Sequence, residues 1–207
     1  MGGGSKGVLI GIEGIDAVGK RTQTSILSSW LRSKGHTTRM VSFPDYGTTL
    51  GREIKRFLVG TRNYPPEVRH MLFAANRWEK KDELESILSK TDIVIVNRYS
   101  ESNLAYGIAN GLKLEWLVSL ETGLPKPDTV IVLDAPPAAL SSRRGPGKDE
   151  YERNAVLQER TRDAYLKLAG LFGWKVINAT GGIDATSQTL IGAVSDSLTV
   201  DANKRHP

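Results

Sequence analysis

A glycine-rich segment near the N-terminus carries a motif with a clear chemical meaning. Gly14 to Lys20, GIDAVGK, fits the pattern G-x-x-x-x-G-K. The two glycines allow the backbone to wrap closely with its N–H groups pointing inward, and the lysine supplies a point charge for the β- and γ-phosphates of a nucleotide. An apolar run at Val8–Ile12 precedes the segment, and residues 22–33 carry apolar side chains at helical spacing. The sequence therefore predicts a phosphate-binding loop between a buried strand and a helix N-terminus.

One position in this loop departs from the pattern. Arg21 stands where a Ser or Thr hydroxyl would ligate Mg²⁺, and Thr22 follows one place late. Consecutive helix positions point about 100° apart, so Thr22 is not an obvious replacement. Arg21 cannot bind a cation; it adds positive charge near the phosphates or points to solvent, and the sequence leaves both alternatives open. The expected donor-binding residues of the loop are Gly14, Asp16, Ala17, Val18, Gly19, Lys20, Arg21 and Thr22, with Lys20 also catalytic.

Composition and length indicate one small enzyme domain. The chain has 207 residues and a formal charge of +5, a mild excess that suits an anionic substrate, without the basic run typical of nucleic-acid binding. The lack of cysteine excludes disulfides, thiolate chemistry and Cys-based metal sites, and the scattered histidines favour packing or solvated roles over metal ligation. No apolar run has membrane-spanning length, and residues 1–6 do not resemble a signal peptide. We expect a cytoplasmic protein without membrane or nucleic-acid partners, with flexible ends at 1–6 and 201–207.

Strand-like and helix-like segments alternate along the whole chain. Five short runs are expected to be strands, at 8–12, 38–43, 92–96, 129–134 and 174–178. Helices are expected at 50–58, 67–89, 137–144, 151–171 and 184–198. Alternation of this kind predicts an α/β fold with a five-stranded parallel sheet flanked by helices on both faces. Ligands bind beyond the carboxyl ends of such strands, so Asp16, Phe43, Asn97, Arg98 and Asp134 are expected to face one cleft.

Several side chains near these strand ends could recognise a nucleotide. Phe73 and Arg77 are four residues apart on one helix face, where they could stack on a base and hydrogen-bond its edge, or else be a core aromatic beside a surface-reaching arginine. Arg98 directly follows a buried strand, which favours phosphate binding. The next helical turn holds three further candidates, which either line the same pocket or serve as helix cap and packing residues: Ser102, Asn103 and Tyr106.

A basic segment interrupted by glycine and proline follows the fourth strand. Arg143, Arg144 and Lys148 flank Gly145-Pro146-Gly147, within a segment, about 142–150, that we call the lid. A basic loop of this kind could close over phosphates, or it could be a solvated turn.

Taken together, these motifs make the chain resemble the thymidylate kinases, members of the nucleoside monophosphate kinase group of P-loop proteins. The resemblance covers nearly the whole chain, and it rests on the order and spacing of IEGIDAVGK, FPDYG, LFAANRWE, NRYSESNLAYG, GLPKPD and the lid followed by YERN. It implies a single domain, 1–207, that transfers the γ-phosphate of ATP to dTMP with Mg²⁺, and that forms a homodimer.

The resemblance also implies roles for individual residues. Asp16 would hold the 3′-hydroxyl of dTMP, and Tyr106 would crowd the 2′ position. Phe73 would stack on thymine, with Arg77 and Asn103 reading its edge. Arg98 would bridge the two phosphates. The lid arginines Arg143 and Arg144 would stabilise the transferring phosphoryl group, and Arg143 would also pack against adenine. The full set expected to bind the acceptor is Asp16, Phe43, Pro44, Tyr46, Phe73, Arg77, Arg98, Ser102, Asn103, Tyr106 and Tyr151.

The chain departs from the family pattern at three places. Besides Arg21, Asn97 stands where the family's D-R-Y motif has an acid, and Asp45 and Tyr46 stand where many relatives have a phosphate-binding arginine. The first two changes remove metal-attracting groups, so no protein ligand to a metal is assigned. They leave open a broader-specificity monophosphate kinase, a deoxynucleoside kinase or a non-catalytic nucleotide-binding protein.

Overall fold

A computed structural model describes residues 7–143, 151 and 154–205, without the side chains of 141–143 and 200–205. Five parallel strands form one sheet in the order β2-β3-β1-β4-β5. The strands are β1 (Val8–Glu13), β2 (Thr38–Ser42), β3 (Ile93–Asn97), β4 (Thr129–Asp134) and β5 (Lys175–Asn178). The five-stranded parallel α/β fold predicted from the sequence is confirmed.

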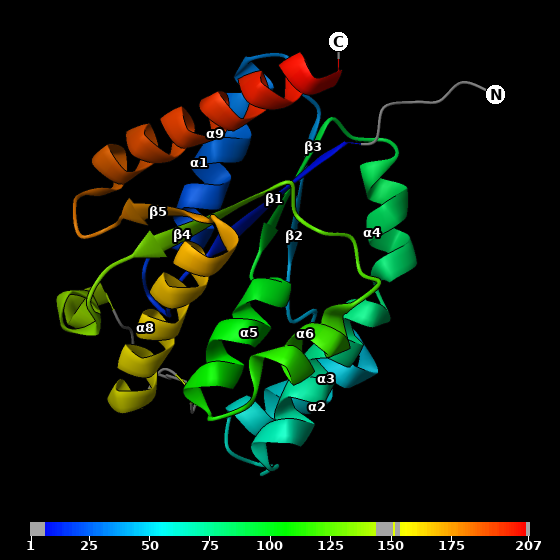
Figure 1. Cartoon of the computed structure of the whole chain (residues 1–207), viewed down its shortest axis with the longest axis vertical. Helices are drawn as coiled ribbons and strands as arrows, with labels where there is room; N and C mark the ends of the chain where they lie inside the picture. Colours follow the sequence, from blue (N-terminus) through cyan, green and yellow to red (C-terminus); the bar gives the residue numbers. More distant parts are fainter. Residues whose placement is uncertain (1–6, 144–150, 152–153, 206–207) are drawn as a thin grey trace.

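Helices cover both faces of this sheet, as expected. The helices of the described residues are α1 (Lys20–Ser33), α2 (Thr49–Leu58), α3 (Pro66–Trp78), α4 (Lys81–Leu88), α5 (Ser100–Ala109), α6 (Leu114–Glu121), the 3₁₀ helix η1 (Pro137–Arg143), α8 (Ala155–Phe172) and α9 (Ile183–Arg205). Figure 1 shows α1 and α9 on one side of the sheet and α4 on the other. Within the described part of the chain, no helix is long and apolar enough to cross a membrane.

The central strands are buried on both faces because they carry β-branched and apolar residues at almost every position. Ile10 and Ile95 pack in one cluster with Leu27 of α1, whereas Leu9 and Val94 pack in a second cluster. Alternate residues of a strand point to opposite faces, so these two clusters lie on opposite sides of the sheet. The rigid sheet fixes the positions of the loops that follow the carboxyl ends of its strands.

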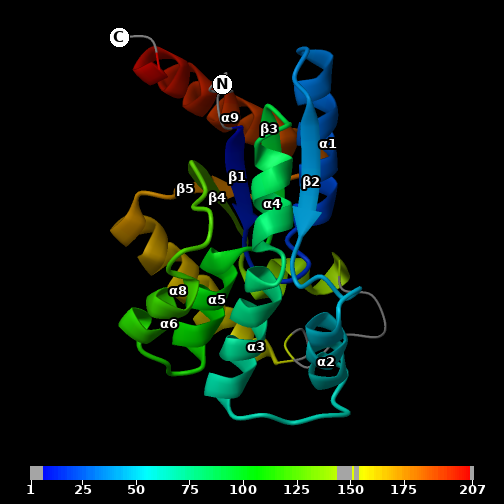
Figure 2. The same cartoon turned by 90° about the vertical axis from the view of Figure 1, so that its right-hand side faces the viewer.

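The helix predicted over 67–89 is wrong as a single element. The structure ends α3 at Trp78 and begins α4 at Lys81. Leu84 and Leu88 of α4 are buried in the cluster that covers β3, whereas α3 packs against α2, α5 and α6. Figure 2 shows α4 beside β3 and α3 below it, beyond the carboxyl ends of the strands. One straight helix cannot pack both on β3 and against α2, α5 and α6, so the chain turns between α3 and α4.

Two other boundaries differ from the sequence prediction. α8 begins at Ala155, where Asn154 caps it by accepting a hydrogen bond from the Leu157 N–H at 2.9 Å. α9 continues to Arg205, into the segment expected to be a flexible end. The sequence analysis also missed α6, which positions a carboxylate described below.

Candidate active site

The phosphate-binding loop joins β1 to α1 through backbone conformations that favour glycine. Gly14 has φ 133° and Gly19 has φ 100°, both in the left-handed region. A Cβ on Gly14 would also lie 2.4 Å from the carbonyl oxygen of Leu133, so no larger residue fits there. Ala17, with φ 63°, adopts the same region without being glycine. A non-glycine residue held in this region is typical of a loop constrained by its function.

Lys20 is folded into this loop. Its ammonium donates to the carbonyl oxygens of Gly14 at 2.9 Å and Ile15 at 2.7 Å, and its side chain is buried. Val18 is buried as well, whereas Arg21 and Thr22, in the first turn of α1, are exposed. The exposed side chain of Arg21 also borders a cavity beyond the carboxyl ends of the strands.

A cavity of about 510 Å³ lies beyond the carboxyl ends of β1, β2 and β3. We call it the acceptor cavity, after the role that the sequence analysis expects for the residues lining it. Every residue that the sequence analysis assigned to acceptor binding lines it: Asp16, Phe43, Pro44, Tyr46, Phe73, Arg77, Arg98, Ser102, Asn103, Tyr106 and Tyr151. Asn97 lines it too. The cavity therefore joins one residue of the phosphate-binding loop to side chains from α3 and α5.

Asp134 was expected to face the same cleft, and this prediction is wrong. Its carboxylate accepts two hydrogen bonds from Arg162 of α8, at 2.7 and 2.9 Å, and it does not line the acceptor cavity. The order of the strands explains this. The acceptor cavity lies beyond β1, β2 and β3, whereas Asp134 ends β4, which lies on the other side of β1 from β3.

Asp16 is the loop residue that reaches into the acceptor cavity. Its carboxylate pairs with the guanidinium of Arg98, and it accepts hydrogen bonds from Tyr106 Oη at 2.8 Å and Gln158 Nε2 at 2.9 Å. Burial opposes ionisation of this carboxyl, but the charges of Arg98 and Lys20 together with these hydrogen bonds lower its pKa to about 2. Asp16 is therefore an anion with its lone pairs held in fixed directions.

Arg98 has φ 61°, uncommon for a residue with a side chain. Its backbone N–H donates to the carbonyl of Ile12 at 3.2 Å, and its guanidinium carbon lies 5.3 Å from the centre of the Tyr106 ring. Burial disfavours the charge, but the Asp16 carboxylate outweighs burial and raises the pKa of Arg98. Strand β3 and this local conformation thus aim a permanent cation into the acceptor cavity.

A buried carboxylate that sequence reasoning missed supports the start of α5. Glu13, the last residue of β1, accepts from the Tyr99 N–H at 2.7 Å and from the hydroxyls of Ser102 at 2.6 Å and Tyr165 at 2.7 Å. Its side chain is fully buried, so these donors supply the hydrogen bonds that water cannot make there. Ser102 is therefore held by Glu13 as well as lying on the cavity wall.

The expected base-reading residues form a connected network that extends beyond the cavity. Arg77 donates through Nε to Glu121 of α6 at 2.9 Å and also pairs with it through Nη2. Asn103 Nδ2 donates to the same carboxylate at 2.7 Å, and Asn103 Oδ1 lies 2.7 Å from Nδ1 of His70. Phe73 is half-buried on the same wall, its ring centre 6.1 Å from that of His70.

His70, Glu121 and Gln158 were not predicted as site residues. His70 is three residues before Phe73, hence on the same helix face, and Glu121 directly precedes the segment that leads into GLPKPD. These sequence positions of His70 and Glu121 were the signals that could have identified them as site residues. Gln158 carried none, because it lies 142 residues from Asp16, whose N–H donates to its side chain at 3.2 Å.

The segment Phe43-Pro44-Asp45 borders the cavity through contacts with α3. Its Phe43-Pro44 peptide bond is cis. Asn76 Oδ1 accepts from the Asp45 N–H at 2.7 Å, and Asn76 Nδ2 donates to the Asp45 carbonyl at 3.2 Å. Asp45 also forms an ion pair with Lys80 at 3.0 Å, which further ties this segment to the turn after α3.

Tyr151, which follows the lid in the sequence, lines the acceptor cavity. Its ring stacks on Tyr106, with centres 5.3 Å apart and planes inclined by 11°. The side chain of Arg143 and residues 144–150, including Arg144 and Lys148, lie outside the described residues.

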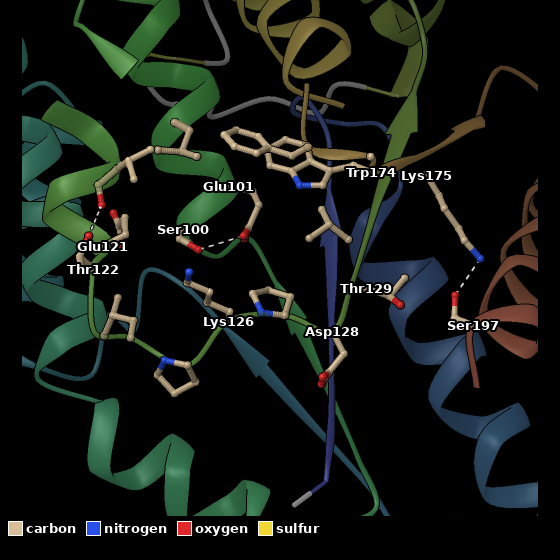
Figure 3. Close-up of a pocket in the computed structure, with 18 of the residues that line it drawn as sticks. Ser100, Glu101, Glu121, Thr122, Lys126, Asp128, Thr129, Trp174, Lys175 and Ser197 are labelled. Carbon is tan, nitrogen blue, oxygen red and sulfur yellow. Dashed lines mark hydrogen bonds between the residues drawn. The ribbon is translucent and has the colours of Figure 1, made fainter. Parts of the chain in front are cut away.

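A second cavity, of about 600 Å³, lies between α5, α6, β4 and α9. Figure 3 shows Glu101, Glu121 and Trp174 on its wall, with Lys175 donating to Ser197 at 2.7 Å. Burial and the nearby charge of Glu13 raise the pKa of Glu101 to about 8. Glu121 lines this second cavity and contacts Arg77 and Asn103, which line the acceptor cavity.

Comparisons with known proteins agree on one family. The family model described as thymidylate kinase matches residues 12–190. A thymidylate kinase of Arabidopsis thaliana is 38% identical over 193 residues, which cover 93% of this chain and 73% of the relative, and that of Homo sapiens is 31% identical over 96% of this chain and 95% of the relative. A solved structure of a thymidylate kinase from Candida albicans, described as having broad substrate specificity, matches with a TM-score of 0.78 at 29% identity, over 98% of this chain and 94% of that one.

Proposed function

The chain belongs to the thymidylate kinase family and transfers a phosphoryl group from ATP to dTMP, and on that premise we propose how its residues divide the work. The observation that carries the proposal is the acceptor cavity. Its wall combines Asp16 of the phosphate-binding loop with Arg98 and with the residues of α3 and α5 that are expected to read the base of dTMP. Donor and acceptor are thereby held by one rigid unit. Phosphoryl transfer depends mainly on such positioning and on charge neutralisation.

The donor binds at the loop formed by Gly14–Lys20. The inward N–H groups of the loop and the Lys20 ammonium neutralise the β- and γ-phosphates. The exposed Arg21 adds a cation at the wall between the loop and the acceptor cavity. Arg143 and Arg144 are proposed to meet the charge that builds up on the transferring phosphoryl oxygens, since arginine matches phosphate geometry.

The acceptor binds with its phosphate toward Arg98 and its base toward α3. Asp16 accepts a hydrogen bond from the 3′-hydroxyl, Tyr106 lies next to the 2′ position, and Phe73 stacks on the ring. The charged Arg98 guanidinium on the cavity wall favours a phosphorylated acceptor over a nucleoside. This supports a monophosphate kinase over a deoxynucleoside kinase.

Mg²⁺ is proposed to accompany ATP mainly through phosphate and water ligands. Within the described residues, no group of three or more His, Cys, Asp or Glu side chains could hold a metal ion. Asn97 Oδ1 at the end of β3 is buried and has no hydrogen-bond partner among the described residues, so one neutral oxygen suited to a hard cation is present. When bound, the ion would supply positive charge that neutralises the donor phosphates.

A homodimer is also proposed, as for the family. Exposed apolar side chains of α3 and α6 support it: Met71, Trp78 and Val118. The cytoplasmic location and the absence of nucleic-acid partners remain predictions.

The function is tested by measuring ADP release with ATP and each candidate acceptor. We expect the highest kcat/KM with dTMP and no turnover of thymidine. A broader monophosphate specificity is the second candidate, favoured by the broad substrate specificity described for the Candida albicans relative, and comparable kcat/KM values for dTMP, dCMP and dGMP would support it instead. ATP binding without turnover of any acceptor would indicate a non-catalytic protein.

A further inference from the structure

Glu121 lies outside the acceptor cavity but contacts two residues that line it. Its carboxylate holds Arg77 through Nε, at 2.9 Å, and through Nη2. It also accepts from Asn103 Nδ2 at 2.7 Å. The exposed fraction of the side chain is 4% for Arg77 and 8% for Glu121, so the pair is shielded from water and its geometry is tightly held.

The second amide hydrogen of Asn103 is also engaged. Nδ2 donates to the backbone carbonyl of His70 at 3.3 Å, in addition to Glu121. Both partners are acceptors only, so the amide cannot be turned around without placing oxygen against oxygen. Asn103 Oδ1 therefore faces His70 Nδ1, which must carry the ring proton and donate it.

The far side of the His70 ring agrees with this assignment. Asn110 Nδ2, which donates to the Tyr106 carbonyl at 2.7 Å, lies 3.4 Å from His70 Nε2. Nε2 is thus an acceptor, as a neutral imidazole protonated at Nδ1 requires. Every hydrogen-bonding direction from Glu121 to Asn110 is consistent with a single arrangement of protons.

We propose that Glu121 is a positioning residue that sets the hydrogen-bonding polarity of the base pocket. It occupies Nε and Nη2 of Arg77 and helps to occupy Nδ2 of Asn103. The groups left for a base are Arg77 Nη1, a donor that makes no hydrogen bond with any described residue, and the remaining lone pair of Asn103 Oδ1, an acceptor. The proposal rests on dTMP being the acceptor.

A donor beside an acceptor matches the edge of thymine and opposes that of cytosine. Thymine offers O4 as an acceptor and N3–H as a donor, whereas cytosine offers its N4 amino group as a donor and N3 as an acceptor. Cytosine would set donor against donor and acceptor against acceptor, which leaves buried polar groups unpaired. Glu121 thereby selects thymine over cytosine without touching the base.

The test compares kcat/KM for dTMP and dCMP in wild type and in Glu121→Gln. A glutamine amide brings hydrogens toward Asn103 or Arg77, which removes the shorter of the two contacts that hold Asn103 Nδ2 and leaves only the His70 carbonyl at 3.3 Å to oppose a turned amide that offers a donor to the base. We expect the dTMP-to-dCMP ratio of kcat/KM to fall at least tenfold, through KM for the nucleotide, with KM for ATP unchanged. Glu115→Gln makes the same change at an exposed position of α6 and should leave the ratio unchanged.

The outcomes separate the proposal from simpler explanations. Equal losses for both nucleotides, leaving the ratio within twofold of wild type, would show a merely structural role for Glu121 and overturn the proposal. Glu121→Asp keeps a carboxylate, which can only accept hydrogen bonds, and should keep the dTMP-to-dCMP ratio within threefold of wild type. This variant carries the test if Glu121→Gln does not fold. A tenfold fall of the ratio in Glu121→Asp would also overturn the proposal. A wild-type enzyme that does not use dTMP would refute the function itself, before any variant is compared.

Discussion

His70 allows the base-reading network to be tested by pH alone. The ring is fully buried between Asn103 and Asn110, and burial, only partly offset by the hydrogen bond to Asn103, lowers its pKa to about 4 from an ordinary value of 6.5. Below pH 6.5 the unfolded chain takes up a proton at this histidine, whereas the folded protein does not until about pH 4. Acid therefore favours the unfolded state across that window.

The size of the effect follows from this shift. One pKa unit corresponds to about 1.4 kcal/mol, so lowering the pH from 7 to 5 should remove about 2 kcal/mol from the free energy of unfolding through His70. The assay is denaturant unfolding at both pH values. His70→Asn places an amide donor near the position of Nδ1 and cannot titrate, so its free energy of unfolding should fall by about 2 kcal/mol less than that of wild type between pH 7 and 5.

The comparison between variants isolates the histidine. His70→Asn will itself destabilise the protein, but that cost is the same at both pH values and cancels in the difference. His36→Asn replaces an exposed histidine and should lose as much stability as wild type. Equal losses in wild type and His70→Asn would show that His70 is not held neutral, and the proton assignment of the network would then be wrong.

Three further predictions concern the reaction itself. Phe73→Ala should cost about 1–3 kcal/mol of base stacking, seen in KM for dTMP and not in KM for ATP; a rise in KM for ATP alone would show that Phe73 is misassigned. At least one of Arg143→Ala and Arg144→Ala should lower kcat about 10³-fold, whereas changes below about threefold for both would indicate a solvated turn. Asn97→Asp should tighten Mg²⁺ binding, measured as the metal concentration giving half-maximal rate, and an unchanged value would place the ion away from β3.

The fold was predictable because its pattern is local. Each buried strand is a short apolar run, and each is separated from the next by helical segments, so the sequence alone indicated a parallel sheet. The missed features depend on tertiary contacts. Nothing within 67–89 marks the end of α3 at Trp78; the turn there follows from α4 packing on the sheet. The short helix α6 was missed in the same way.

The candidate site was predictable where chemistry follows a strand or a motif. Asp16, Phe43 and Arg98 sit at strand ends, so one edge of the sheet gathers them. Glu121 and Gln158 could not be found this way, because their importance lies in partners 44 and 142 residues distant in the chain. A lone carboxylate or amide has no periodicity that indicates what it will contact.

Asp16 links the proposed donor and acceptor sites of this chain. It belongs to the loop proposed to bind the donor phosphates, yet the side chains that fix its carboxylate, Arg98, Tyr106 and Gln158, come from α8 and from the β3–α5 wall of the acceptor cavity. Any movement of the loop must therefore move against residues proposed to hold the acceptor. Because phosphoryl transfer depends on the alignment of two nucleotides, a carboxylate shared by both proposed sites would fix that alignment before either substrate binds. The charge on Arg98 is balanced by the same carboxylate, so under the proposed function the acceptor phosphate would meet a cation that is already oriented.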